Sequence, residues 1–255
     1  MGDVFLPDHR TEVEPSPRWV KVFFHGEVVA DSREVLMVRE TGRLPRYYFP
    51  KKDVRTEWLQ PSDHREPGRP KGTEVFWHLA VGERLSEDAA STFHDPPAGA
   101  PHLAGHLTFE WEKMDAWYEE DEEVFVHLRD PYKRIDVIGS SRHIRVALDG
   151  VDVAETSRPR LLFETGMPTR FYFPPADVNL GLLEKSTRTT GCPYKGEANY
   201  YSIRLGKKLY PDLVWYYRFP TLNCSAIAGQ LCFFGEKMDI YDGGQLLERP
   251  KTPWS

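Results

Sequence analysis

The stretch ETGRLPRYYFPKKDV, residues 40–54, returns later in the chain as ETGMPTRFYFPPADV, residues 164–178. Residue 40 corresponds to residue 164, so the two copies are offset by 124 residues. The same offset aligns EKMD at 112–115 with EKMD at 236–239. Roughly 30 of about 100 paired positions are identical and no gap is needed, so a tandem duplication explains the chain better than chance does.

The composition limits the class of protein. The 255 residues suffice for two modest domains, and 40% hydrophobic with 28% charged residues is typical of globular chains. The net charge of −6 argues against a general nucleic-acid surface, which would be basic, so we expect no nucleic-acid partner. No apolar run is long enough to span a bilayer, and the first ten residues lack the apolar core of a signal peptide. We therefore expect no membrane partner.

The cysteines indicate the compartment. Cys192, Cys224 and Cys232 are odd in number and all lie in the second copy. A disulfide framework fits this pattern poorly, and reduced thiols in the cytoplasm fit it better. Neither a Cys-x-x-Cys pair nor a His-Glu-x-x-His motif occurs, so the sequence predicts no metal site. No motif specifies a cofactor or an oligomeric state.

Short strands separated by turn residues predict that each copy is mainly β. Asp149-Gly150 between two extended runs is a strong hairpin signal, because a type I′ turn needs positive φ at both central residues. His25-Gly26 occupies the same place in the first copy. Other segments predict a short helix from Pro50 to about Leu59, polar loops, and a closing hairpin in each copy. The loops are at 62–70 and 186–193, and the first hairpin is at 107–118 with its turn near Glu112-Lys113.

Composition changes along the chain predict five segments. We expect an N-terminal arm, a first repeat domain, a linker, a second repeat domain and a C-terminal tail, at residues 1–17, 18–125, 126–141, 142–246 and 247–255. The acidic run at 119–123 is interpreted as a solvated rim of the linker. We expect the two repeats to pack against each other through that linker.

The repeated motifs resemble a family catalogued as domain of unknown function 427, also labelled nucleotidyltransferase-like. The matching elements in the second copy are ETG at 164–166, RFYFPPADV at 170–178, CPYKG at 192–196 and the aromatic pair Tyr200-Tyr201. The resemblance covers nearly all of both copies and implies β-rich domains of tent-like or open-barrel type. It implies no agreed activity. The nucleotidyltransferase label has no support from the residues, because neither a Gly-Ser with an Asp-x-Asp metal pair nor a Walker-type glycine loop occurs.

Neither copy carries the complete family pattern. The first keeps Asp63-His64 but has Gly68-Arg69 where Cys-Pro is expected. The second keeps Cys192-Pro193 but has Thr187-Arg188 where Asp-His is expected. The two copies are therefore not expected to be equally active.

Cys192 is the candidate nucleophile. It lies three residues before Lys195 and four after Arg188, and nearby cations stabilise the thiolate that attacks electrophiles. The alternative is a buried structural thiol ahead of a proline turn, because free cysteines are often buried. Cys224 and Cys232 lie in apolar patterns and are expected in the core.

Several other residues could bind an anion, and each has a structural alternative. The candidate ligand-binding residues are Arg46, Tyr48, His64, Lys71, Arg170, Tyr172, Arg188, Lys195 and Tyr200. Arg46 and Arg170 could bind a phosphate or carboxylate, or could pair with Glu40 and Glu164. The lysines precede glycines, where a backbone can approach a ligand closely or simply turn. The tyrosines are core or pocket wall, and His64 is a general base or a surface partner of Asp63.

Two functions follow. The first is a cytoplasmic protein that binds a small anionic molecule in an Arg-, Tyr- and Lys-lined site, with catalysis through Cys192. The second is a non-catalytic scaffold or protein-interaction module. Convergence of Arg170, Tyr172, Cys192 and Lys195 on one cleft would favour the first, because binding sites are concave with few convergent polar groups.

Overall fold

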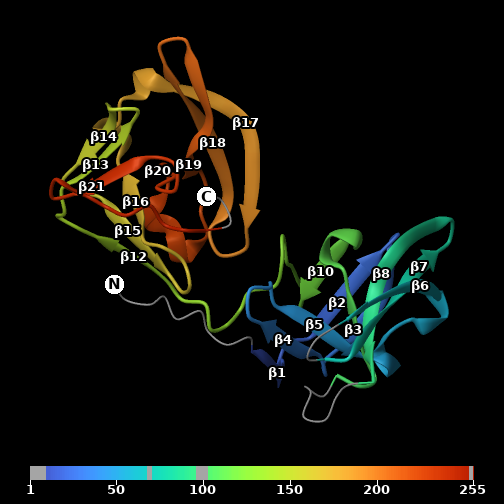
Figure 1. The fold of residues 1–255 in the computed structure, drawn as a ribbon. Coiled ribbons are helices and arrows are strands. Elements are labelled where there is room, and N and C mark those ends of the chain that lie inside the picture. Colours follow the sequence, from blue (N-terminus) through green and yellow to red (C-terminus); the bar gives the residue numbers. More distant parts are fainter. Residues whose placement is uncertain (1–9, 68–70, 96–102, 253–254) are drawn as a thin grey trace. The chain divides into compact units, whose positions relative to one another are not determined.

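The computed structural model describes residues 10–67, 71–95, 103–252 and 255, and it divides into two compact units, residues 1–129 and 130–255. Figure 1 shows that strands dominate both units. The helical elements of the described residues are short 3-10 turns. Each unit is described by itself below.

The first unit contains two antiparallel sheets. A seven-stranded sheet has the order β1-β4-β5-β9-β8-β7-β6, and a four-stranded sheet has the order β11-β10-β2-β3. The strands are β1 (Thr11–Pro15), β2 (Val20–Phe24), β3 (Glu27–Ser32), β4 (Leu36–Glu40), β5 (Arg46–Pro50), β6 (Leu59–Pro67), β7 (Thr73–Val81), β8 (Arg84–His94), β9 (His106–Phe109), β10 (Ala116–Glu119) and β11 (Glu122–Glu123). The 3-10 turns are η1 (Lys51–Asp53), η2 (Thr56–Trp58) and η3 (Trp111–Lys113).

The second unit repeats this arrangement. Its sheets have the orders β12-β15-β16-β20-β19-β18-β17 and β14-β13-β21-β22. The strands are β12 (Ile135–Gly139), β13 (Ile144–Leu148), β14 (Val151–Thr156), β15 (Arg160–Glu164), β16 (Arg170–Phe173), β17 (Leu183–Cys192), β18 (Gly196–Leu205), β19 (Lys208–Tyr217), β20 (Leu231–Phe233), β21 (Asp239–Asp242) and β22 (Gln245–Leu246). The 3-10 turns are η4 (Pro175–Asp177), η5 (Leu180–Leu182) and η6 (Leu222–Ile227).

The constant offset extends to the elements themselves. β2 and β13 begin at residues 20 and 144, and β5 and β16 begin at residues 46 and 170, the same spacing as in the sequence. The ETG stretches both form a turn after a strand, with φ of 79° at Gly42 and 75° at Gly166. The predicted duplication and mainly β fold class are therefore confirmed.

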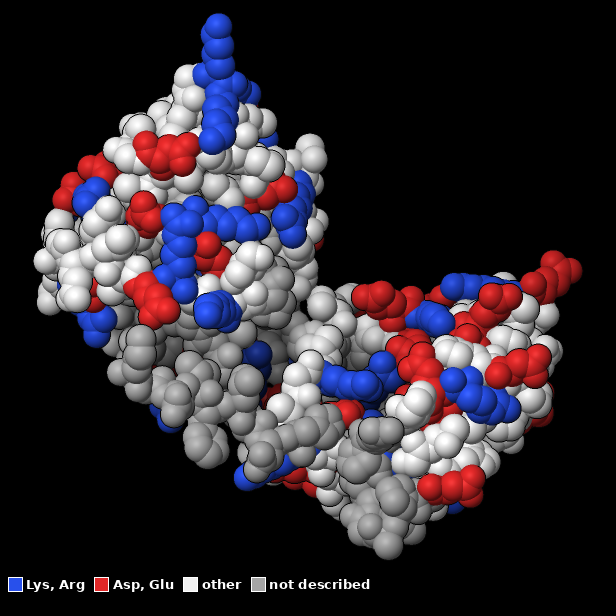
Figure 2. Space-filling view, in the orientation of Figure 1, with Lys and Arg blue, Asp and Glu red and all other residues white. Residues whose placement is uncertain are grey.

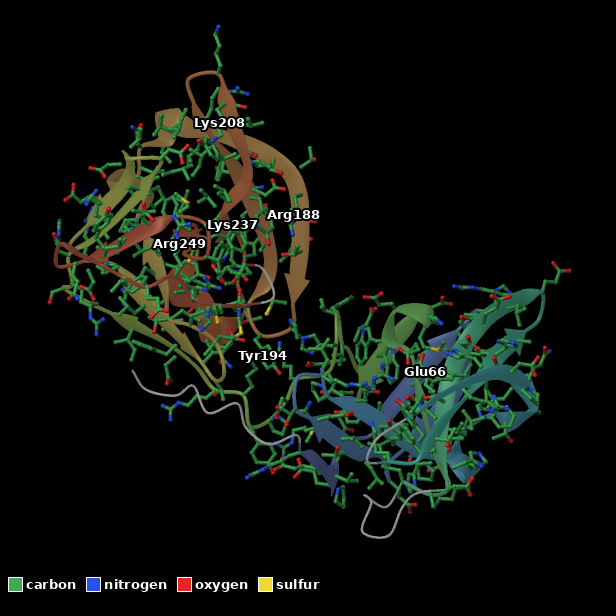
Figure 3. All side chains as sticks on the ribbon, in the orientation of Figure 1. Glu66, Arg188, Tyr194, Lys208, Lys237 and Arg249 are labelled. Atoms are coloured by element: carbon green, nitrogen blue, oxygen red, sulfur yellow. The ribbon has the colours of Figure 1, made fainter. Side chains whose placement is uncertain are left out.

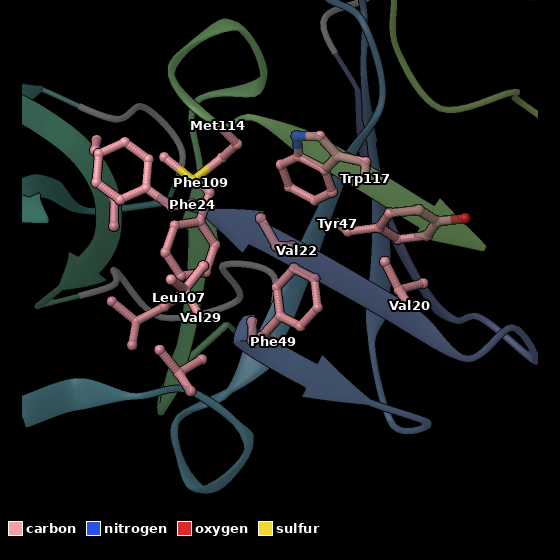
Figure 4. Close-up of a cluster of buried hydrophobic side chains, with 14 of the residues drawn as sticks. Val20, Val22, Phe24, Val29, Tyr47, Phe49, Leu107, Phe109, Met114 and Trp117 are labelled. Atoms are coloured by element: carbon pink, nitrogen blue, oxygen red, sulfur yellow. The ribbon is translucent and has the colours of Figure 1, made fainter. Parts of the chain in front are cut away.

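In each unit the two sheets enclose one apolar core. Figure 4 shows this core in the first unit, where Val22 of the small sheet and Phe49 of the large sheet both contribute. Side chains alternate along β5, so Tyr47 and Phe49 join this core while Tyr48 joins a smaller cluster on the opposite face. We call that opposite face, turned away from the four-stranded sheet, the outer face.

The outer face of the second unit is richer in aromatic side chains. Its cluster contains Tyr172, Tyr200, Trp215 and Tyr217, and η6 adds Cys224. The alternation along β16 again separates Tyr172 from Phe171 and Phe173, which belong to the main core. This face carries most of the residues that the sequence singled out.

Three local expectations are wrong. The polar segments expected as loops from 62 and 186 are largely strands, β6 and β17, because each is an edge strand whose side chains are mostly exposed. The expected closing hairpin does not form, since β9 pairs with β5 and β8 whereas β10 pairs with β2. The expected helix from Pro50 to Leu59 is two 3-10 turns, η1 and η2.

The segments expected as arm and linker also contribute strands, and the expected tail contributes a hydrogen bond. β1 pairs with β4, and β12 pairs with β15, so each adds an edge strand to a large sheet. β22 pairs with β21, and the Thr252 hydroxyl donates a 2.7 Å hydrogen bond to Glu236. Among the described residues, no helix has the length and apolar character needed to cross a membrane.

Candidate functional site

Two lysines share one buried carboxylate on the outer face of the second unit. Lys133 Nζ lies 2.9 Å from Glu164, and Lys195 contacts the other carboxylate oxygen. Burial alone would raise the pKa of Glu164, but the two ammonium groups lower it overall. We call Lys133, Glu164 and Lys195 the Glu164 cluster. With one carboxylate between two ammonium groups, the cluster carries one net positive charge.

The turn after β17 places further groups beside this cluster. Lys133 Nζ lies 5.4 Å from the centre of the Tyr194 ring. The Tyr194 hydroxyl accepts a 2.7 Å hydrogen bond from the Asp130 amide, and Thr221 donates one of 2.6 Å to the Tyr194 carbonyl. Figure 3 shows Tyr194 at this end of the unit. The segment is therefore held from both sides.

Cys192 lies at the end of β17, half-buried and in the reduced form. Its thiol is an electrostatic neighbour of Tyr194, Tyr217 and Cys224. Among the described residues, no histidine or carboxylate forms a hydrogen bond with it. Cys224 and Cys232 are buried, as predicted, and burial raises the pKa of Cys224 and raises that of Cys232 to about 12.

Backbone packing explains why a glycine follows the lysine in both copies, at Lys195-Gly196 and at Lys71-Gly72. Gly196 has a φ of +102°, and a Cβ there would lie 3.0 Å from the Phe219 carbonyl oxygen. Gly72 has the same φ, and its Cβ would lie 2.3 Å from the His94 carbonyl. The close approach anticipated at these glycines is thus to the chain's own backbone.

Arg170 pairs with a carboxylate other than the one considered from the sequence. Its guanidinium makes bidentate hydrogen bonds of 2.9 and 2.6 Å with Glu236, and Trp215 lies against it at 5.4 Å. The expected pairing with Glu164 is wrong, because Lys195 and Lys133 occupy that carboxylate. Tyr172 is buried, and its hydroxyl accepts a 3.2 Å hydrogen bond from Trp215.

The matching residues of the first unit lie together, but around very little space. Arg46, Tyr48 and Lys71 line a cavity of about 10 Å³ with Glu40 and Glu74. Such a volume holds at most about one water molecule. The lysine pairing follows the second unit, since Lys71 binds Glu40 at 2.7 Å. Arg46 makes bidentate contacts of 2.7 and 3.0 Å with Glu110, which is not the counterpart of Glu236 at the constant offset. The considered pairing of Arg46 with Glu40 is therefore also wrong.

His64 belongs to a different constellation, which the second unit repeats with an arginine. The His64 ring stacks on Phe76 at 4.2 Å, and its Nδ1 lies 3.0 Å from Asp88, not beside Asp63. At the matching positions Arg188 lies 4.9 Å from the Tyr200 ring and 3.6 Å from Asp212.

β-bulges position both constellations. The register shifts between Pro61 and Arg65 in one unit and between Lys185 and Thr189 in the other. Asp88 of β8 and Asp212 of β19 adopt positive φ of 49° and 54°, at further register shifts where β7 pairs with β8 and β18 pairs with β19. Non-glycine residues in this conformation are strained, which requires the surrounding strands to hold them. Figure 3 shows Arg188 on β17, away from Tyr194 in the turn after that strand, and the partners of Arg188 are Asp212 and Tyr200 rather than Glu164.

Comparison with known proteins identifies a family that matches the chain twice, over residues 12–120 and 136–244. The matched segments together span most of the chain and coincide with the two copies. The chain belongs to the family described as domain of unknown function 427 (DUF427). The resemblance noted from the motifs is thereby confirmed. No curated protein matches the chain.

Sequence reasoning missed several residues of this DUF427 chain. Lys133, Tyr194 and Glu236 contact the predicted residues, and Glu74 is a buried carboxylate on the outer face of the first unit. The repeated EKMD motif contained the only signal for Glu236, and it did not indicate a partner. Lys133 lies outside the aligned region, so no comparison between copies could single it out.

The charges of the DUF427 chain alternate in sign over the face shown in Figure 2, where Lys and Arg lie among Asp and Glu. Among the described residues, no three His, Cys, Asp or Glu side chains are grouped to hold a metal ion. The groups available for chemistry here are the two ammonium groups of the Glu164 cluster, the neighbouring Tyr194 phenol and the Cys192 thiol.

Proposed function

We propose that the second unit binds a small anionic molecule at the Glu164 cluster. The observation that carries this proposal is that Lys133 and Lys195 share one carboxylate, which leaves one positive charge uncompensated within the cluster. The Lys133 side chain is 28% exposed, so an ammonium group is accessible from solvent. A carboxylate or phosphate group would complete the charge balance there.

The outer face of the first unit is less suited to an anion. Glu74 is buried there and accepts a 2.7 Å hydrogen bond from Ser91, whereas Ala198 occupies the matching position in the second unit. A buried carboxylate repels an anionic ligand at short range, and its replacement by alanine removes that repulsion. The proposal therefore assigns binding to the second unit alone.

Cys192 extends the proposal from binding to reaction. Its half-buried thiol neighbours Tyr194, whose ring faces Lys133. Attack of the Cys192 thiolate on an electrophilic carbon of such an anion would form a C–S bond and expel the leaving group that this carbon carries. We infer that Cys192 is the nucleophile if the protein is an enzyme.

A thermal-shift screen tests the binding proposal. The ligands are inorganic phosphate, sugar phosphates, nucleotides and small organic acids, because a ligand that binds only the folded state raises the melting temperature. We expect one of these classes to raise it in the wild type and in Cys192→Ser, but not in Lys133→Gln. Arg43→Gln is the matched control, since Arg43 lies 3.8 Å from Glu40 in the first unit. No shift with any class, or an equal shift in Lys133→Gln, would reject the proposal.

One observation favours the second candidate function, a protein-interaction module. Phe219 and Leu222 are 82% and 88% exposed, beside the segment that holds Tyr194 and Lys195. Neighbouring apolar side chains this exposed mark interaction surfaces. The double variant Phe219→Ser/Leu222→Ser should leave stability unchanged and abolish any specific partner binding. Anion binding that persists in this variant would separate the two functions.

A further inference from the structure

The second unit contains a cavity that is separate from the Glu164 cluster. Its volume is about 280 Å³, close to the smallest ligand-binding pockets. It opens between the ends of the large-sheet strands, the small sheet and the segment after β22. Residues that line it include Phe171, Phe233, Gly235, Ile240, Asp242 and Glu248.

The first unit fills the corresponding space with an indole. At the constant offset Gly235 corresponds to Trp111 and Ile240 corresponds to Ala116. Trp111 stacks on Trp117 with ring centres 4.4 Å apart, and it packs against the main core. The exchange of tryptophan for glycine thus removes an indole from this position of the second unit, and Ile240 replaces only part of its volume.

The backbone does not require glycine at this position. Gly235 lacks the positive φ that favours glycine elsewhere in the chain. A Cβ there would meet the end of the Ile240 side chain at 2.9 Å, which can rotate away, and the Pro250 ring at 3.8 Å, an ordinary contact. Neither turn geometry nor backbone packing therefore demands the glycine, and the larger Ile240 side chain takes up part of the space beside it.

The cavity has both apolar and polar walls, and most of its charged groups are paired. Phe171, Phe233 and Ile240 form apolar walls. Arg142 pairs with Asp242 at 3.1 Å, and Arg170 is held by Glu236.

Glu248 differs from these paired groups. It lines the cavity, is exposed, and no described residue forms an ion pair or hydrogen bond with its carboxylate. Its negative charge is therefore available to a ligand.

We propose that this cavity binds a small molecule that has an apolar part and one ammonium group. The apolar part would pack against Phe171, Phe233 and Ile240, where burial of each CH₂ is favourable. The ammonium group would lie at the mouth beside Glu248. This ligand class is opposite in charge to that proposed for the Glu164 cluster, so the two sites are independent.

Ligand-observed NMR titration with phenethylamine tests the cavity. The matched variant is Gly235→Trp/Ile240→Ala, which introduces the Trp111/Ala116 pair of the first unit. We expect saturable binding to the wild type and at least tenfold weaker binding to the filled variant. Thermal unfolding verifies that the variant folds, and Gly235→Leu serves as a smaller filling if it does not. Equal binding to wild type and filled protein would overturn the proposal.

Two further binding measurements test the preference for a positively charged ligand. Phenylacetate, which has the same ring and the opposite charge, should bind at least several-fold more weakly than phenethylamine. Glu248→Gln should weaken phenethylamine binding about two- to fivefold, the range for an exposed ion pair. Tighter binding of phenylacetate, or no loss in Glu248→Gln, would reject the ammonium assignment. Lys133→Gln should bind phenethylamine normally, so failure of the anion site would be distinguishable.

Discussion

The pairing of Arg170 with Glu236 shows how strongly burial changes the value of an ion pair. The two side chains are 11% and 0% exposed, whereas those of Arg46 and Glu110 in the first unit are 39% and 28% exposed. Breaking a buried pair leaves one charge without compensation in a poorly solvated site, whereas an exposed charge returns to water. The same bidentate geometry therefore has different energetic consequences in the two copies.

Arg170→Met should consequently destabilise the protein by about 3–5 kcal/mol, because Glu236 would remain buried without its partner. The matched variant Arg46→Met should cost about 1 kcal/mol or less. Urea unfolding of both variants measures the difference. Equal losses of stability would contradict the role assigned to burial.

Stability should also fall at low pH because the Glu236 carboxylate becomes protonated. Burial alone would raise the pKa of Glu236, but Arg170 and Thr252 lower it below its usual value of 4.5. A carboxylate with a lowered folded-state pKa stabilises the protein above the unfolded-state pKa, and this contribution disappears as pH falls through the folded-state pKa. We expect the wild type to lose more stability than Glu236→Gln between about pH 5 and pH 3. If the free energy of unfolding falls in parallel with pH in both proteins, this linkage is disproved.

The three thiols should differ in reactivity with iodoacetamide. Cys192 is half-buried, whereas Cys224 and Cys232 are buried and have raised pKa values. Because the thiolate is the reactive form, Cys192 should label faster than both at neutral pH. Mass spectrometry of the folded protein measures each site. Labelling of Cys192 no faster than the other two would remove the proposed nucleophile.

At the scale of elements, the two small-sheet hairpins have the predicted turns. Asp149 and Gly150 have φ of 48° and 79°, and His25 and Gly26 have φ of 53° and 79°. Both central residues are thus in the left-handed region, as a type I′ turn requires. The local sequence was sufficient here because the turn is specified by adjacent residues.

Gly150→Val should therefore destabilise the protein by about 1 kcal/mol or more, since a β-branched residue is strained at positive φ. Gly181→Ala is the control, because Gly181 is not at positive φ and a Cβ there would lie 3.4 Å from Asn179. Differential scanning calorimetry compares the two variants. An unchanged melting temperature for Gly150→Val would argue against turn strain.

The bulges show how neighbouring strands fix the backbone conformation of single residues. Asp88 and Asp212 keep positive φ because adjacent strands hold them, with the Asp88 amide donating a 3.0 Å hydrogen bond to His78 and the Asp212 amide one of 3.2 Å to Ser202. His64 of β6 and Arg188 of β17 pair with these aspartates across the intervening strand, β7 or β18. The duplication has thus preserved a strained aspartate and exchanged the side chain that pairs with it.

At the scale of the whole molecule, each unit has its own core and its own two sheets. The DUF427 matches likewise fall within single units. A domain with a complete core can fold without its neighbour. Residues 1–129 and 130–255, expressed separately, should therefore each unfold cooperatively.

Circular dichroism and thermal melts measure whether each fragment folds and unfolds cooperatively. The second fragment should also retain any anion binding seen in the full chain, because the Glu164 cluster lies wholly within it. A fragment that remains unfolded would show that the units depend on each other.

The sequence by itself determined the duplication, the mainly β class and the small-sheet turns. Identities at a constant offset and glycines at positive φ are local signals, so one copy could be checked against the other. It also indicated where Arg170, Lys195 and Cys192 would lie relative to the strands. It did not indicate that segments 62–67 and 186–192 are strands, since a polar edge strand has the composition of a loop.

Only the tertiary structure decided which charges meet. Arg170 pairs with Glu236, 66 residues away, and Glu164 instead binds two lysines, because sheet order places those side chains together. The cavity at Gly235 could likewise not be predicted from the sequence. A glycine in place of Trp111 causes no local irregularity of the backbone, and the loss of the indole leaves space only where the two sheets and the segment after β22 meet.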